Sequence, residues 1–243
     1  MPLQTEKNGR ELRFAALLLL LILMVGTFLC AFLLPLLSDS LPEGTAAAIL
    51  YYLTSLLSVA VLFSGAAGTV FGLVNARFSF AVFSSAALFL CLLSAELLPI
   101  LIAPITRTDA SLGEVFSANA DVFFSRAAFD FLRVVLIWAG ALAGIAVAAR
   151  GKEKQKQRAF FLSALFCAVL LCLLPALTEL FETTIPFFAS ASRNQQNAEL
   201  PKILLEYFLY LLYGVIGFFL ERALCRLFAR LAAPAASGKP VKR

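Results

Sequence analysis

Ionisable side chains within apolar stretches are the residues of this sequence that could do chemistry. Glu96 and Glu206 each stand in an otherwise apolar run, Glu179 follows directly after another run that could continue through it, and Asp130 and Arg133 share a fourth run. A charge at the centre of a bilayer costs about 2.5 to 3.5 kcal/mol on insertion scales, so such residues are the first candidates for a functional site. Together they could bind a cation, a proton or a small polar solute.

Two interpretations compete for each of these candidates. Asp130 stands four residues after Arg126 and three before Arg133, so the three side chains share one helical face and can pair with one another. For Asp130 we favour this ion pairing over a binding role. Glu96 and Glu179 have no local basic partner, and each lies within four residues of a proline. Proline frees backbone carbonyls that could join a carboxylate in a cation site, whereas a simple kink is the alternative.

The sequence lacks the residues that several enzyme classes need. The sequence contains no histidine, which excludes His-ligated zinc, axial-His haem and Ser-His catalysis. Its five cysteines form no Cys-x-x-Cys motif, so neither a redox pair nor a thiolate metal site is indicated. We therefore expect no enzyme activity, no cofactor and no metal site.

The elements that must position the candidate residues are transmembrane helices. Hydrophobic residues make up 61% of the 243 residues and charged residues only 14%, which excludes a water-soluble globule. A helix needs about 20 mostly apolar residues to cross a bilayer. Six runs meet this requirement: 14–37, 46–74, 78–105, 123–149, 159–178 and 203–220. The predicted fold class is an all-α membrane protein with six transmembrane helices.

Lysine and arginine gather at alternate ends of these runs. They precede the first run, fill residues 150–158 and follow the last run, whereas residues 38–45 contain no base. Short basic connections stay on the cytoplasmic side, so both termini are predicted to be cytoplasmic. With this orientation all five candidates fall in the outer half of the membrane. Glu96 and Arg133 both lie roughly 14 Å below the outer surface and could meet in one polar pocket.

The chain divides into a six-helix membrane domain, residues 14–232, between a cytoplasmic N-terminal tail, residues 1–13, and a basic cytoplasmic C-terminal tail, residues 233–243. Arg13-Phe14 and Arg77-Phe78 each open a run, and this spacing is compatible with three helical hairpins of the same orientation, although it does not favour them over chance similarity. Shared membrane composition is the alternative explanation of the spacing.

Two Gly-x-x-x-Gly patterns place small residues on one face of the second and fourth runs. They join Gly68 to Gly72 and Gly140 to Gly144. Small residues let helix backbones approach closely in lipid, so we expect these faces to pack inside the bundle.

The function that this pattern favours is transport or binding of a small solute or cation, without ATP, through the outer-half polar pocket. The alternative is a non-catalytic partner or assembly subunit of a larger membrane complex, in contact with another membrane protein. A compact chain without a glycosylation sequon favours the bacterial cytoplasmic membrane. The basic helix ends indicate contact with anionic lipids at the cytoplasmic face rather than with nucleic acid.

Overall fold

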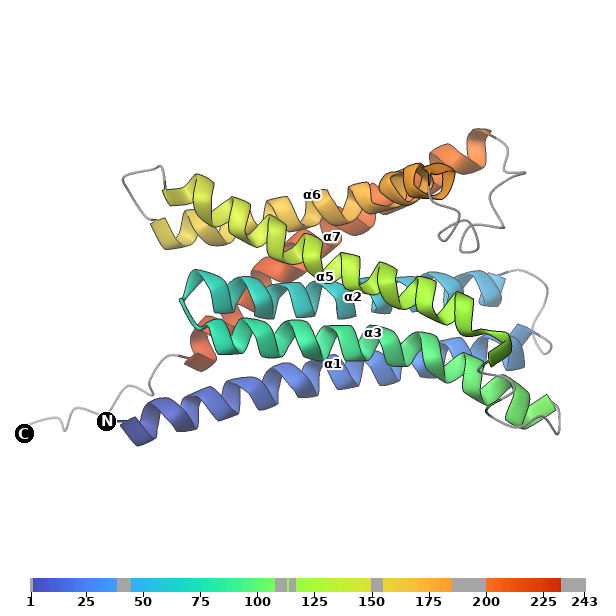
Figure 1. The fold of residues 1–243 in the computed structure, drawn as a ribbon, viewed down its shortest axis with the longest axis horizontal. Helices are drawn as coiled ribbons and strands as arrows, with labels where there is room; N and C mark the ends of the chain where they lie inside the picture. Colours follow the sequence, from blue (N-terminus) through green and yellow to red (C-terminus); the bar gives the residue numbers. More distant parts are fainter. Residues whose placement is uncertain are drawn as a thin grey trace, which may run out of the picture.

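The architecture is a bundle of long α-helices (Figure 1). The computed structural model describes residues 2–38, 45–107, 113, 117–149, 155–184 and 200–232. Nearly all of them belong to α1 (Pro2–Ser38), α2 (Thr45–Val74), α3 (Phe78–Arg107), α5 (Ala120–Ala149), α6 (Gln155–Thr184) and α7 (Leu200–Ala232). All six helices are long and apolar enough to cross a membrane, so the predicted all-α fold is confirmed. The chain is therefore compatible with a multi-pass membrane protein.

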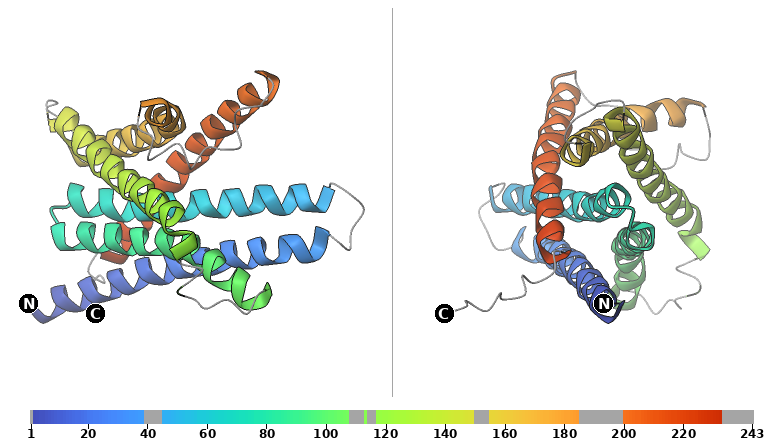
Figure 2. Two further views of the ribbon diagram at one scale, coloured as in Figure 1. Left: turned by 45° about the vertical axis from the view of Figure 1, so that its right-hand side comes forward. Right: turned by 90° about the vertical axis from the view of Figure 1, so that its left-hand side faces the viewer.

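Three helices form one group and two form another. α1, α2 and α3 lie side by side, α5 and α6 pack along each other, and α7 crosses the bundle obliquely (Figures 1 and 2). α7 contacts α1, α2 and α6. The start of α1, the turn between α2 and α3 and the end of α7 all lie at one end of the bundle (Figure 1). A chain that crosses a membrane six times returns to the side from which it started.

The turn between α2 and α3 is tight because the last turn of α2 is capped by its own backbone. The Arg77 amide donates to the Gly72 carbonyl oxygen over 2.7 Å, and the Ala76 amide donates to the Leu73 carbonyl oxygen over 3.1 Å. These are the two hydrogen bonds of a Schellman cap. The cap needs a left-handed residue, and Ala76 takes this place with φ 55°.

Glycines set the closest helix contacts of the bundle, as their spacing predicted. A Cβ added to Gly72 on α2 would lie 2.6 Å from the backbone nitrogen of Ala81 on α3. A Cβ added to Gly140 on α5 would lie 2.8 Å from the backbone nitrogen of Cys167 on α6. Backbone atoms cannot move aside as a side chain can, so only glycine allows this approach.

Two helices extend beyond the predicted apolar runs. Residues 2–13, assigned above to an N-terminal tail, form the first three turns of α1, where Leu12 is buried. α7 likewise continues past Leu220, where the predicted last run ends, and reaches Ala232. The most extensive helix contact in the described part of the chain is that of α5 with α6, which the three-hairpin grouping assigns to separate hairpins. That grouping stays a prediction.

Candidate functional site

Asp130 and Arg133 form an ion pair within α5. Arg133 Nη1 donates to Asp130 Oδ1 over 2.7 Å, and only 2% of the Asp130 side chain is exposed. The Arg133 guanidinium also lies over the Phe129 ring, 4.7 Å from its centroid. Asp130 and Arg133 thus hold each other, as expected from their spacing, and this arrangement favours a structural role for the pair.

For the other three acids among the predicted site residues, the structure describes the helix to which each belongs but not the side chain. Glu96 lies on α3, Glu179 on α6 and Glu206 on α7. In the described part of the chain α3 and α6 make no contact with each other, whereas α5 contacts both. Figure 2 shows α5 passing between them. The expected meeting of Glu96 with Glu179 stays a prediction, and the two helices that carry them are not neighbours.

A different acid, Glu221, occupies the interior of the bundle. Its side chain on α7 has no exposed surface, and neither carboxyl oxygen has a hydrogen-bond partner among the residues that the structure describes. Burying an ionised carboxylate without a partner costs several kcal/mol or more, so such a group is rare in a folded core. Glu221 is therefore the most unusual ionisable side chain among the described residues.

Close packing of α7 against α2 and α6 encloses Glu221. One turn before it, Gly217 leaves room for the ring of Phe63 on α2, which a Cβ at this glycine would overlap. One turn after it, Cys225 Sγ donates to the carbonyl oxygen of Ala67 on α2 over 3.5 Å. Both contacts draw α7 onto α2, with the carboxyl between them.

Among the described residues, two thiols lie close enough to the Glu221 carboxyl to interact with it electrostatically. They belong to Cys225 on α7 and Cys167 on α6. Cys167 Sγ donates to the carbonyl oxygen of Ile137 on α5 over 3.3 Å, so this thiol is directed to a third helix. Glu221 thus lies where α2, α6 and α7 meet, beside neutral groups.

No cation among the described side chains neutralises Glu221. Arg222, the next residue, points to a different face of α7. Its guanidinium lies 5.3 Å from the Phe161 ring centroid and 5.7 Å from that of Phe218. Cation–π contacts therefore hold the nearest base in the sequence away from the acid.

Four phenylalanine rings close the bundle towards the end that carries the α2–α3 turn. This phenylalanine cluster consists of Phe71, Phe80, Phe160 and Phe228, from α2, α3, α6 and α7. The Phe71 centroid lies 5.9 Å, 6.3 Å and 6.0 Å from those of Phe80, Phe160 and Phe228, respectively. Phe228 follows Glu221 by seven residues, or about 10 Å along the helix. The cluster therefore separates Glu221 from that end of the bundle.

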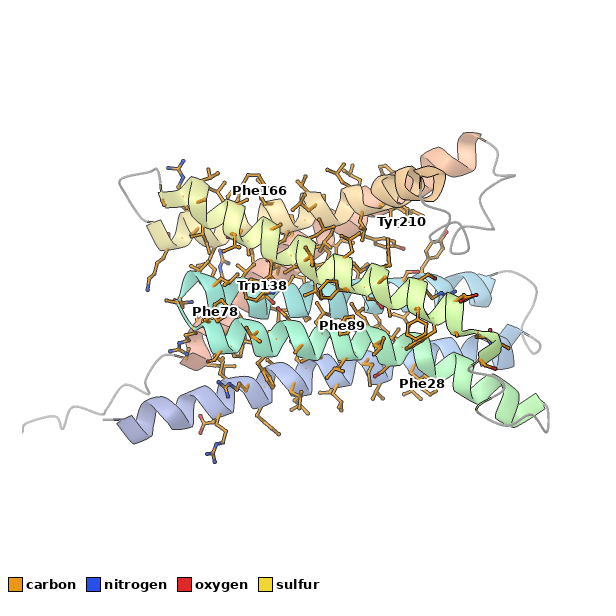
Figure 3. All side chains as sticks on the ribbon, viewed as in Figure 1. Phe28, Phe78, Phe89, Trp138, Phe166 and Tyr210 are labelled. Atoms are coloured by element: carbon orange, nitrogen blue, oxygen red, sulfur yellow. The ribbon has the colours of Figure 1, made fainter. Side chains whose placement is uncertain are left out.

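A hydrogen-bond chain joins α2, α3 and α5 in the half of the bundle that carries the α2–α3 turn. Trp138 Nε1 on α5 donates to Ser85 Oγ on α3 over 2.8 Å, and Ser85 Oγ lies 2.9 Å from Thr69 Oγ1 on α2. The Trp138 ring also packs on Phe78, with centroids 5.5 Å apart, and Figure 3 shows these two rings together. This chain satisfies its own polar groups and fixes the positions of α2, α3 and α5.

Sequence reasoning missed Glu221 because the last span was ended one residue before it, at the start of the basic segment. A signal was nevertheless present. Gly217, Glu221, Leu224 and Phe228 recur at spacings of three and four and share one face of the helix. Leu224 and Phe228 are buried, so the apolar face continues past the acid, while the arginines that follow lie elsewhere on the helix.

Comparison of the chain with protein-family models, with characterised proteins and with solved structures finds no match. In the described residues no three histidine, cysteine, aspartate or glutamate side chains gather closely enough to hold a metal ion. The geometry around Glu221 is thus the basis on which a function can be argued.

Proposed function

We propose that this membrane protein binds a small cation inside its helix bundle and carries it across the membrane, with Glu221 as the binding carboxyl. The observation that supports this proposal is the complete enclosure of a carboxyl whose two oxygens have no hydrogen-bond partner in the described part of the chain. An acid that forms neither an ion pair nor a hydrogen bond lowers the stability of the fold. A positively charged ligand would compensate this cost, which makes ion binding the function that best accounts for Glu221.

In this proposal, the acids that are predicted to lie in the outer half of the membrane form the entrance for the cation. Glu96, Glu179 and Glu206 lie towards the ends of their helices that are remote from the α2–α3 turn. Carboxylates at one mouth of a pathway raise the local concentration of cations and could also contact a small polar solute. In this proposal the predicted outer pocket collects the cation and Glu221 receives it.

The proposed orientation places the α2–α3 turn in the cytoplasm, together with both termini. Arg13 supports this orientation, since it is exposed at that end and donates to Ser79 over 3.1 Å. Arg226 and Arg230 are exposed on the last turns of α7. Such a basic end suits the anionic lipids of a bacterial cytoplasmic membrane. The proposed activity is non-enzymatic transport.

Electrical recording on a solid-supported membrane tests this function. Vesicles with reconstituted protein receive sudden jumps in the concentration of protons, sodium or potassium, and the transient current is measured. Wild type should give a current for at least one cation, and Glu221→Gln, which removes the charge at constant shape, should lose it. Glu11→Gln changes an exposed glutamate on α1 and should retain the current.

Two outcomes would overturn the proposal. One is the absence of any cation current above that of protein-free vesicles, while circular dichroism shows folded protein. The other is a Glu221→Gln current equal to that of wild type. In the first case the alternative, a non-catalytic partner subunit of a larger complex, becomes the better explanation. This alternative predicts that a second membrane protein is purified together with this one in mild detergent.

A further inference from the structure

We propose that the cation bound at Glu221 is a proton, and that the phenylalanine cluster is the barrier between this carboxyl and cytoplasmic water. The inference rests on the proposed function and names its substrate. It follows from the ligands that the site offers and from the rings that lie on one side of it.

The surroundings of Glu221 provide too few ligands for a metal ion. Calcium takes six to eight oxygen ligands and magnesium six, whereas this carboxyl provides two oxygens in an apolar setting. The neighbouring thiols of Cys167 and Cys225 each donate to a carbonyl oxygen of another helix, at 3.3 and 3.5 Å. They therefore do not converge on the carboxyl as ligands of a soft metal would. A proton needs a single oxygen.

The groups facing Glu221 allow its charge to change without a fixed counter-ion. Of the elements packed against α7, α6 presents the Cys167 thiol and α2 presents residues 61–72, which contain no ionisable side chain. On α7 itself the facing group is the Cys225 thiol. The nearby charged residues of α1, Glu11 and Arg13, are exposed. Protonated Glu221 is neutral and can stay in this apolar position, whereas the ionised form requires water or a cation.

The phenylalanine cluster keeps water from reaching the carboxyl on the cytoplasmic side. Phe71 and Phe228 are each no more than 2% exposed, and the Phe80 and Phe228 centroids lie 5.9 Å apart. Rings from four helices thus close the space at one level of the bundle. Hydrophobic constrictions of this kind stop ions by excluding water, and they open when their side chains separate. Release of the proton to the cytoplasm therefore requires Phe228 to move away from Phe71.

Infrared difference spectroscopy tests the proton at Glu221. A protonated carboxyl has a C=O stretching band that a carboxylate lacks, and hydrogen–deuterium exchange shifts it. Wild type in lipid at neutral pH should show such a band, Glu221→Gln should lack it, and Asp130→Asn should retain it because Asp130 is ion-paired. A spectrum without a band specific to Glu221 would overturn the proton assignment.

Labelling of the native Cys225 thiol tests the barrier, because this residue lies between Glu221 and Phe228 on α7. Inside-out vesicles are treated with a membrane-impermeant methanethiosulfonate, and the label on Cys225 is quantified by peptide mass spectrometry. Phe228→Ala should raise the labelling rate roughly tenfold, because local opening becomes easier when the ring is absent. The control Phe219→Ala removes a ring that is 62% exposed and should leave the rate unchanged.

The outcomes separate the barrier and the proton from the proposed function. An unchanged labelling rate of Cys225 in Phe228→Ala would overturn the barrier. If the alanine variant does not fold, Phe228→Leu provides the same comparison, because leucine removes the ring but keeps most of the side-chain volume. A sodium or potassium current that depends on Glu221, without the infrared band, would overturn the proton and leave the function standing. The infrared band without any cation current would support proton binding and overturn transport.

Discussion

The contact between α5 and α6 allows a sharp prediction about a single methyl group. A Cβ at Gly144 would overlap the backbone nitrogen and Cα of Ser163, which belong to the main chain of α6. Gly26 on α1 is a matched control, since a Cβ there would meet only the Leu57 side chain, at 3.6 Å. Gly144→Ala should therefore push two helices apart, whereas Gly26→Ala adds an ordinary contact.

The size of the effect follows from three contributions. Forcing an extra methyl group into a close-packed contact costs about 1 to 3 kcal/mol. Separation of the helices also weakens the bond that Ser163 Oγ donates to the Ala141 carbonyl oxygen over 2.9 Å, which contributes about 0.5 to 1.5 kcal/mol. Replacement of glycine by alanine in a helix stabilises the helix by about 0.5 to 1 kcal/mol. This contribution is the same at both positions and cancels in the comparison. Gly144→Ala should thus be less stable than Gly26→Ala by about 1.5 to 4.5 kcal/mol.

Unfolding in mixed micelles measures this difference. The protein has a single tryptophan, Trp138, whose ring packs between α5 and α3, so its fluorescence reports loss of helix packing. The free energy of unfolding of each variant is obtained from titration with sodium dodecyl sulfate. Equal stability of Gly144→Ala and Gly26→Ala would refute the reasoning, because it would mean that α5 and α6 do not meet through their backbones.

Three further predictions concern stability. Glu221→Met should raise the free energy of unfolding by about 1 to 3 kcal/mol, because an apolar chain of similar length replaces an unpartnered carboxyl; a loss of stability in detergent melting would contradict this. Trp138→Phe should cost about 1 kcal/mol through loss of the hydrogen bond to Ser85, and a variant that melts like wild type would show that the bond is absent. Ala76→Gly should stabilise by roughly 1 kcal/mol, because glycine tolerates the φ of 55° at the α2–α3 turn; an unchanged melting temperature would argue against that backbone geometry.

The helices could be predicted from the sequence because a membrane requires long apolar runs, and this requirement is visible in composition alone. The packing role of Gly72 and Gly140 was equally visible, since small residues four apart must share a face. The pairing of Asp130 with Arg133 was foreseen for the same reason. All of these properties depend on residues within one helix.

The interior position of Glu221 was not predicted, because it depends on contacts between helices. Whether Glu221 faces lipid, water or protein is decided by Phe63 and Ala67 on α2 and Cys167 on α6, far away in the sequence. The adjacent arginine also obscured it, since a charge next to a base at a helix end normally marks the membrane surface. A search for acids on the buried face of each helix, continued past the first charge, would have found Glu221.

Proton uptake driven by a membrane potential tests the central claim most directly. Proteoliposomes with an internal pH-sensitive dye receive a negative-inside potassium diffusion potential, and internal acidification is followed for wild type and for Glu221→Gln. Our account predicts rapid acidification with wild type and, with the folded variant, only the slow rate of protein-free vesicles. Acidification by Glu221→Gln as fast as that by wild type would contradict it.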